Sequence, residues 1–309
     1  MLFVSPLRTS QLPEKPWQTG AVVRLVISVV IGILIGAVVS TVIRYFETPE
    51  TAPVFKFLSL AAAAVISYVA AIVMLSRPWP SEPGIVRLII LLTLIYGGIF
   101  LTWAASKLIK GDVELKNTVV AMLIAVLAFQ GLALLLTHFF LNEHSTGWLE
   151  AFGLDLHTGQ SLLIGMGVGV LILYPVLLLN DLCFQLFERL TLHPHEQQTV
   201  EILRQTATLA GRIASGIATV LIAPIGEEII FRGILYPWAK RSFSQPAALW
   251  STAVLFGAIH FNLSSFIPLT MLALVLIYLY EYTGNLLAPI AVHVVFNGAN
   301  FIALFFQQK

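Results

Sequence analysis

The sequence predicts an all-α, polytopic transmembrane helical bundle. Three observations point to that class. The chain of 309 residues is 58% hydrophobic and only 11% charged, whereas a soluble domain carries about 25% charged residues. Its apolar residues gather in runs of about 20, the length that an α-helix needs to cross a bilayer. These runs do not alternate apolar and polar residues, as the strands of a membrane β-barrel would.

Apolar runs along the chain are predicted to form eight or nine membrane-spanning helices. In the first half they cover residues 21–43, 53–76, 85–106, 118–141 and 161–187. In the second half they cover residues 207–236, 247–262, 265–282 and 286–306. The run at 247–262 is short, so we expect it to tilt or to cross only part of the bilayer.

The distribution of charge divides the chain into four parts. Residues 1–20 are polar and contain prolines, which is typical of a short extramembrane tail. Residues 21–187 carry few charges inside their apolar runs and are predicted to be a scaffold of transmembrane helices. Residues 188–206 form the most polar internal stretch, predicted to be a loop or an interfacial helix. Residues 207–309 carry nearly every charge expected at membrane depth, so we predict the chemistry there.

Composition also excludes several kinds of site and partner. The net charge of +1 gives no argument for a nucleic-acid partner. The single cysteine excludes an intrachain disulfide and a cysteine-based metal cluster. Gly165, Gly167 and Gly169 follow no predicted strand, so they are expected to pack helices closely rather than to hold a nucleotide. The compact, loop-poor chain predicts a multi-pass protein of a bacterial plasma membrane, with the lipid bilayer as its surroundings.

One apolar run contains Glu227, Glu228 and Arg232. A charge at membrane depth costs about 2.5–3.5 kcal/mol on insertion scales, so such residues need partners or a function. Glu228 and Arg232 are four residues apart and share a helix face, in the order that favours an ion pair. We predict a mainly structural role for that pair. Glu227 lies about 100° around the helix and lacks that partner. It is either a general base or, if Pro224 and Gly226 break the helix, a capping carboxylate.

Two later helices carry matching polar residues. One contains His260 at the end of the sequence Phe-Gly-Ala-Ile-His, and the other contains His293 and Asn297. His293 and Asn297 are four residues apart, so both point to one side of their helix. The three segments can therefore converge on one buried polar site between the C-terminal helices.

The motifs Glu-Glu-x-x-x-Arg, Phe-x-x-x-His and His-x-x-x-Asn, in this order on separate membrane helices, resemble the CPBP family. These are the type II CAAX-prenyl endopeptidases and bacteriocin-processing (ABI) intramembrane proteases. The resemblance covers the C-terminal helices. It implies an intramembrane endopeptidase that hydrolyses membrane-associated or lipidated peptides and proteins. It further implies the following roles: Glu227 as general base on a water that His260 helps to hold, oxyanion stabilisation by His293 and Asn297, and support of the site by Glu228 and Arg232.

The sequence leaves metal dependence open. Glu227, His260 and His293 also make a plausible Zn²⁺ set with an open fourth position. No His-Glu-x-x-His helix is present, and Asn297 would be a poor zinc ligand, so metal-free glutamate catalysis is slightly favoured over zinc.

Two interpretations without catalysis also stay open. One is an immunity or scaffold protein of the same fold, against which the complete set of motifs argues. The other is a proton-coupled transporter in which buried Glu, His and Arg side chains form a relay. Such transporters often contain inverted repeats, and the sequence contains no recognisable repeat.

Overall fold

The computed structural model describes residues 12–46, 119–155, 157–191, 209–260 and 262–306, with a few single positions between them. The predicted spans 53–76 and 85–106 and most of the predicted polar segment 188–206 lie outside these residues. Every regular element of the described ranges is a helix. This confirms the predicted all-α class. Apolar runs form helices in lipid because they must satisfy their backbone hydrogen bonds within the segment.

Four of the described helices are long and apolar enough to cross a membrane. They are Thr158–Arg189, Leu209–Ser242, Leu263–Thr283 and Leu287–Leu304. A shorter apolar helix covers Thr19–Ile35. This pattern is that of an integral membrane protein with several spans. The total of eight or nine spans stays a prediction.

The chain divides into two compact units. One unit, Thr19–Phe140, includes helix α1 (Thr19–Phe46) and most of α4 (Val119–Glu143). Both helices occur where the sequence predicts its first and fourth spans. The other unit contains residues 12–18 and the chain from Leu141 onward, and it holds all the candidate site residues.

The larger unit begins with two helices of different kinds. The short helix α5 (Trp148–Phe152) was not predicted, because its five residues carry no periodic signal. Helix α6 (Thr158–Arg189) corresponds to the predicted span 161–187. It ends at Arg189, so the first two residues of the predicted polar segment, Glu188 and Arg189, are helical.

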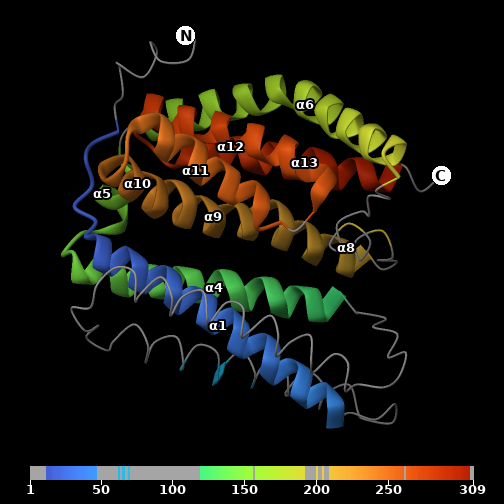
Figure 1. Ribbon diagram of the computed structural model, residues 1–309, viewed down its shortest axis with the longest axis horizontal. Helices are drawn as coiled ribbons and strands as arrows, with labels where there is room; N and C mark the ends of the chain where they lie inside the picture. The colour runs from blue at the N-terminus through green and yellow to red at the C-terminus, as the bar shows by residue number, and fades with distance from the viewer. Residues whose placement is uncertain are drawn as a thin grey trace. The chain divides into compact units, whose positions relative to one another are not determined.

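Three further helices of this unit lie after residue 244. They are α11 (Gln245–Ala258), α12 (Leu263–Thr283) and α13 (Leu287–Phe306). The 14 residues of α11 are too few to span the hydrocarbon, as predicted for that short run. Helix α6 packs along both α12 and α13, and α11 packs on α12. Figure 1 shows α6, α12 and α13 running alongside one another.

Two glycines let α6 approach α13 closely. A Cβ added at Gly165 would lie 2.3 Å from the carbonyl oxygen of Ala288. One added at Gly169 would lie 2.9 Å from the Cβ of Val295. No described residue lies within 4 Å of a Cβ added at Gly167. The prediction of close helix packing is therefore confirmed for Gly165 and Gly169, and it is wrong for Gly167.

Gly165→Ala should consequently push α6 away from α13. Because the obstacle is backbone, we expect a loss of roughly 1–3 kcal/mol in the free energy of unfolding, the usual cost of overpacking. Gly167→Ala is the matched control in the same helix, expected to be neutral or slightly stabilising. Thermal unfolding in detergent compares the two variants. Equal melting temperatures would show that the helices do not depend on this contact.

The stretch that contains Glu227 and Glu228 lies in one uninterrupted helix, in which α-helical and π-helical hydrogen bonding alternate. It runs through α8 (Leu209–Gly216), the π-helical segment η2 (Ile217–Ile222), α9 (Ala223–Glu228), the π-helical segment η3 (Ile229–Leu235) and α10 (Tyr236–Ser242). The N–H of Ala223 bonds to the carbonyl of Ala218, and the N–H of Tyr236 bonds to that of Phe231. Both bonds span five residues instead of four. The alternative of a helix broken at Pro224 and Gly226 is therefore wrong, because the backbone stays helical through them.

Candidate active site

A buried network joins the helix of the two glutamates to α13. Nη1 of Arg232 donates to Oε1 of Glu228 at 2.8 Å, which confirms the predicted ion pair. Nδ1 of His293 donates to the same oxygen at 2.8 Å. The three side chains are between 0% and 3% exposed. Glu228 thus accepts from donors on two helices. The bond from His293 on α13 was not predicted, because spacing within one helix gives no information about contacts with another.

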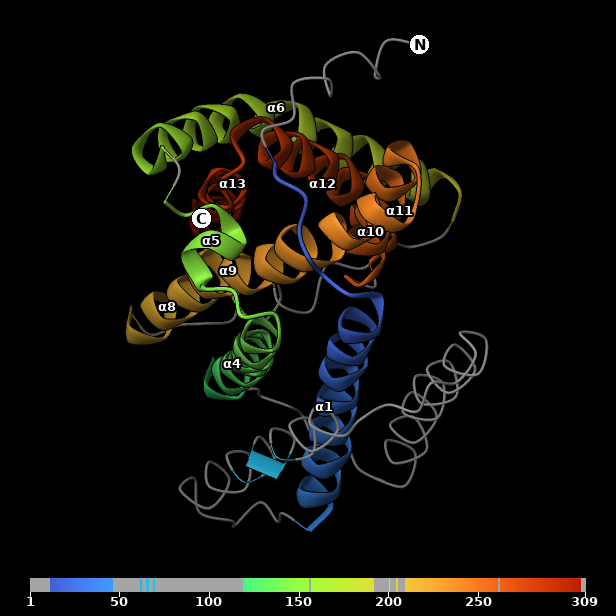
Figure 2. The ribbon, with the colours of Figure 1, turned by 90° about the vertical axis from the view of Figure 1, so that its left-hand side faces the viewer.

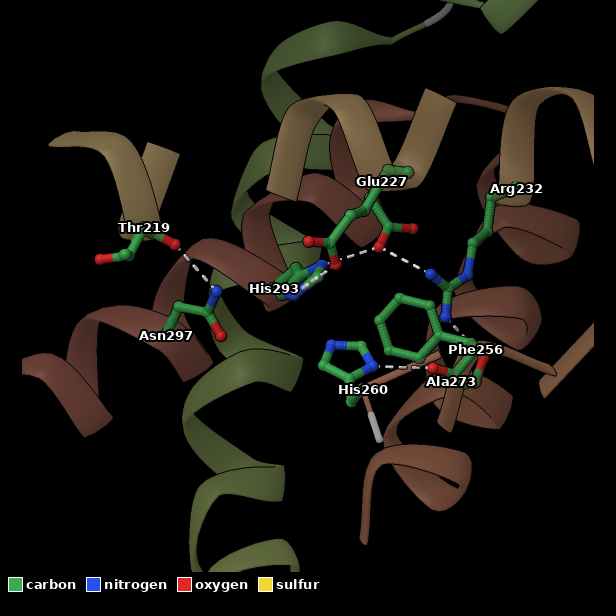
Figure 3. A network of polar contacts seen from close by, with 9 residues as sticks. Thr219, Glu227, Arg232, Phe256, His260, Ala273, His293 and Asn297 are labelled. Carbon is green, nitrogen blue, oxygen red and sulfur yellow. Dashed lines mark hydrogen bonds and ion pairs between the residues drawn. The ribbon is translucent and has the colours of Figure 1, made fainter. Parts of the chain in front are cut away.

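Glu227 lies beside this network without an ion pair to Arg232. Its Oε2 is 3.8 Å from Nε2 of His293. Its side chain is 18% exposed, more than any other member of the network. Oε2 of Glu227 has no hydrogen-bond partner among the described residues. Figure 3 shows the Glu227 side chain directed toward His293. The carboxylate therefore lies near a histidine, and its buried Oε2 accepts no hydrogen bond from a described residue.

The ring of Phe256 connects the two histidines. The centroid of this fully buried ring is 5.0 Å from that of His260 and 5.8 Å from that of His293. The guanidinium carbon of Arg232 lies 4.4 Å from the same centroid, within the range of a cation–π contact. The phenylalanine of the Phe-x-x-x-His motif was not assigned a role from the sequence. Its position four residues before His260 was the signal that could have found it.

The two histidines are fixed in the same way. Nδ1 of His260 lies 2.8 Å from the carbonyl oxygen of Phe256, so that nitrogen carries the proton and donates. Nδ1 of His293 donates to Glu228. In both rings the hydrogen bond at Nδ1 leaves Nε2 for other partners, which is how a second group orients a catalytic histidine.

Asn297 takes part in a contact that the sequence did not predict. Its Nδ2 donates to the carbonyl oxygen of Thr219 at 3.0 Å, between α13 and η2 (Figure 3). An amide nitrogen carries two N–H groups, so this bond uses one of them. Asn297 therefore holds the two helices together at the candidate site, one helical turn along α13 from His293.

A second buried cluster joins α10 to α12. Glu281 is 1% exposed. It accepts from the hydroxyl of Tyr236 at 2.6 Å and from Nζ of Lys240 at 2.7 and 2.8 Å. The two donors come from the end of the helix that carries Glu227. This cluster fixes that end of the helix by a satisfied, charge-assisted network.

The proposed zinc ligands do not form a metal site in this arrangement. No three His, Cys, Asp or Glu side chains of the described residues are grouped so that they could hold a metal ion. As placed, Glu227, His260 and His293 are therefore not grouped as the ligands of a Zn²⁺ ion.

The helices that carry the candidate site are similar to a known protein family. Residues 209–299 match the family described as type II CAAX prenyl endopeptidase Rce1-like. These helices are therefore similar to that family. The match contains all six predicted site residues, and it confirms the resemblance to the CPBP proteases over those residues. Residues before 209 lie outside the Rce1-like match.

One curated relative is similar over a short stretch. The uncharacterized protein YpbD of Bacillus subtilis (strain 168) is 36% identical over 81 residues, which are 25% of this chain and 38% of that protein. The similarity thus spans well under half of either chain. No solved structure matches the chain significantly.

Proposed function

We propose that the protein is an intramembrane endopeptidase that uses Glu227 as a general base on water. Its substrates would be membrane-associated or lipidated peptides and proteins, cut within or beside the bilayer of a bacterial plasma membrane. The similarity to a Bacillus subtilis protein supports the bacterial location. The Rce1-like match supports the reaction class.

One observation carries the proposal. In the Rce1-like region, a carboxylate without an arginine partner lies 3.8 Å from the free nitrogen of a histidine, and a second carboxylate anchors the other nitrogen of that ring. Such a division of two carboxylates between a reacting and an orienting role is typical of acid–base catalysis.

In the proposed reaction, Glu227 accepts a proton from water as the water oxygen bonds to the scissile carbonyl carbon. His260 helps to hold and polarise that water through Nε2. The carbonyl oxygen becomes an oxyanion. The remaining amide N–H of Asn297 stabilises it, together with Nε2–H of a His293 ring that is protonated at both nitrogens. Glu228 supports that form of His293 by accepting from Nδ1.

The intermediate then collapses to products. The C–N bond breaks, and Glu227 returns its proton to the leaving amine. This releases one peptide with a new carboxylic acid, which loses its remaining proton to water, and one with a new amino terminus, and Glu227 is again ionised. Because each proton that Glu227 takes is given back, the cycle needs no other co-reactant than water.

His260→Ala and His293→Ala test this division of roles. We expect each to lower peptide cleavage by about 10²-fold or more, the usual contribution of a positioned acid–base group or oxyanion donor. Cleavage is measured with fluorogenic peptides, prenylated and unprenylated, by the purified protein in nanodiscs. A chelator should leave the wild-type rate unchanged, because no step uses a metal.

Three outcomes would count against the proposal. Wild-type turnover in either histidine variant would remove that residue from the mechanism. Loss of wild-type activity with chelator, restored by Zn²⁺, would favour the metal alternative. Absence of any cleavage, with a pH-driven ion flux in liposomes instead, would favour a transporter. His138→Ala in α4 is a matched control, because it changes a histidine of the other compact unit.

A further inference from the structure

Each π-helical segment of the glutamate-bearing helix is followed by a proline. The last five-residue bond of η2 is made by the N–H of Ala223, and the next residue is Pro224. The last such bond of η3 is made by the N–H of Tyr236, and the next residue is Pro237. Proline has no N–H to donate, so each of them leaves a preceding carbonyl without its helical partner.

A side chain from a distant segment supplies the missing donor at both places. Where η2 passes into α9, an N–H at residue 224 would bond to the carbonyl of Val220 in the α register or to that of Thr219 in the π register, and Asn297 donates to the carbonyl of Thr219. Where η3 passes into α10, an N–H at residue 237 would bond to the carbonyl of Arg232 in the π register or, in the α register, to that of Gly233. Nε1 of Trp17 donates to that oxygen at 3.1 Å, in a buried contact. The two prolines bracket Glu227, Glu228 and Arg232.

Trp17 belongs to a short segment, residues 12–18, that we call the strap. The strap has no regular secondary structure, yet Leu12, Lys15 and Trp17 are at most 7% exposed. Nζ of Lys15 donates to the carbonyl oxygen of Glu150 in α5 at 3.1 Å. Burial lowers the pKa of Lys15, which the carboxylates of Glu150 and Asp155 partly offset. The strap, predicted to be part of an extramembrane tail, is therefore packed against the larger unit (Figure 2).

Gly233 is enclosed from a second side by α5. A Cβ at Gly233 would lie 2.5 Å from Cε1 of Phe152, a ring that is 1% exposed. The indole of Trp17 also meets His144 edge-on, with 5.3 Å between the ring centroids. The carbonyl of Gly233 is thus shielded from water. A shielded carbonyl without a donor is costly, so the indole N–H has a defined task there.

We propose that Trp17 is a positioning residue for catalysis: by bonding to the carbonyl that Pro237 leaves free, the strap fixes the register of the helix that carries Glu227 and Arg232. This inference rests on the proposed function. It extends the machinery to a segment outside the Rce1-like match, 216 positions from its partner in sequence. Trp17 touches no reacting atom and acts through the helix.

The test is a double-mutant cycle between Trp17 and Pro237. Trp17→Phe keeps an aromatic ring but removes the N–H, whereas Pro237→Ala restores a backbone N–H that can bond to Gly233. We expect Trp17→Phe to lower kcat about tenfold with KM within about twofold, because the helix is displaced while substrate binding is kept. In the Pro237→Ala background the same change should lower kcat less than about threefold. Trp250→Phe, at a 52% exposed position of α11, should leave kcat unchanged.

Amide hydrogen exchange over residues 229–242 gives a readout that is independent of activity. Exchange should be faster in Trp17→Phe and near the wild-type rate in the double variant. Equal effects of Trp17→Phe on kcat in both backgrounds would overturn the proposal. If the wild type cleaves no peptide, the proposed function fails. Separately, an unchanged rate of amide exchange in Trp17→Phe would overturn the proposal that the strap fixes the register of this helix. If Trp17→Phe does not accumulate, recovery of the protein by Pro237→Ala supports the proposal and failure to recover contradicts it.

Discussion

Glu227→Gln is expected to abolish peptide cleavage, by at least about 10²-fold, while the protein accumulates at its wild-type level. The amide keeps the size of the carboxylate but cannot accept the proton of the attacking water. Stability should be little affected, because Oε2 of Glu227 bonds to no described residue and lies 3.8 Å from Nε2 of His293, beyond hydrogen-bond distance. The measurement is turnover of a fluorogenic peptide by purified protein in nanodiscs, normalised to the amount of folded protein.

Glu188→Gln is the matched control for this experiment. It makes the same chemical change at an exposed position near the end of α6. We expect it to cleave at the wild-type rate. Cleavage by Glu227→Gln within about twofold of this control would remove Glu227 as general base, since such a group contributes 10²–10⁴-fold.

Arg232→Ala is expected to lower the amount of folded protein sharply. The change removes the only strong cation that Glu228 has in the described network and leaves a fully buried carboxylate without it. Breaking a buried ion pair from one side costs roughly 3–5 kcal/mol, which is a large part of the stability of a typical protein. Abundance in isolated membranes and thermal unfolding in detergent measure the loss.

Two variants make this result specific to the buried pair. Arg241→Ala changes an arginine that is 51% exposed. Its partner, the exposed carboxylate of Glu14, lies 3.8 Å away, so this surface pair contributes little and the protein should accumulate normally. The double variant Glu228→Gln with Arg232→Met removes both charges together, and it should recover much of the lost protein. An unchanged level of Arg232→Ala would show that the ion pair does not stabilise the fold.

Much of the fold could be predicted because apolar runs of spanning length leave few alternatives to a helix in lipid. Helices α6, α12 and α13 begin and end within a few residues of their predicted runs. The hydrogen-bond register within the helices was harder to predict. Apolar periodicity does not distinguish a bond of five residues from one of four, so η2 and η3 were not predicted. The short helix α5 had too few residues to give a pattern.

Some contacts of the candidate site could also be predicted from the sequence, and others could not. Contacts within one helix, such as Glu228 with Arg232, follow from spacing. Contacts between helices do not. The bond from His293 to Glu228 joins residues 65 apart, and that from Trp17 to Gly233 joins residues 216 apart. Pro224 and Pro237 did carry a usable signal. Each proline in a helix leaves a carbonyl to be satisfied, which predicts a nearby donor even though the sequence does not name it.

The most direct test of the central claim compares new protein N-termini in membranes that express the wild-type chain or Glu227→Gln at equal levels. The proposed endopeptidase predicts N-termini that are present with the wild type and absent with the variant, and their sequences would identify the substrates. The same set of N-termini in both membranes would contradict peptide hydrolysis by Glu227 and would favour an immunity or scaffold protein of the same fold.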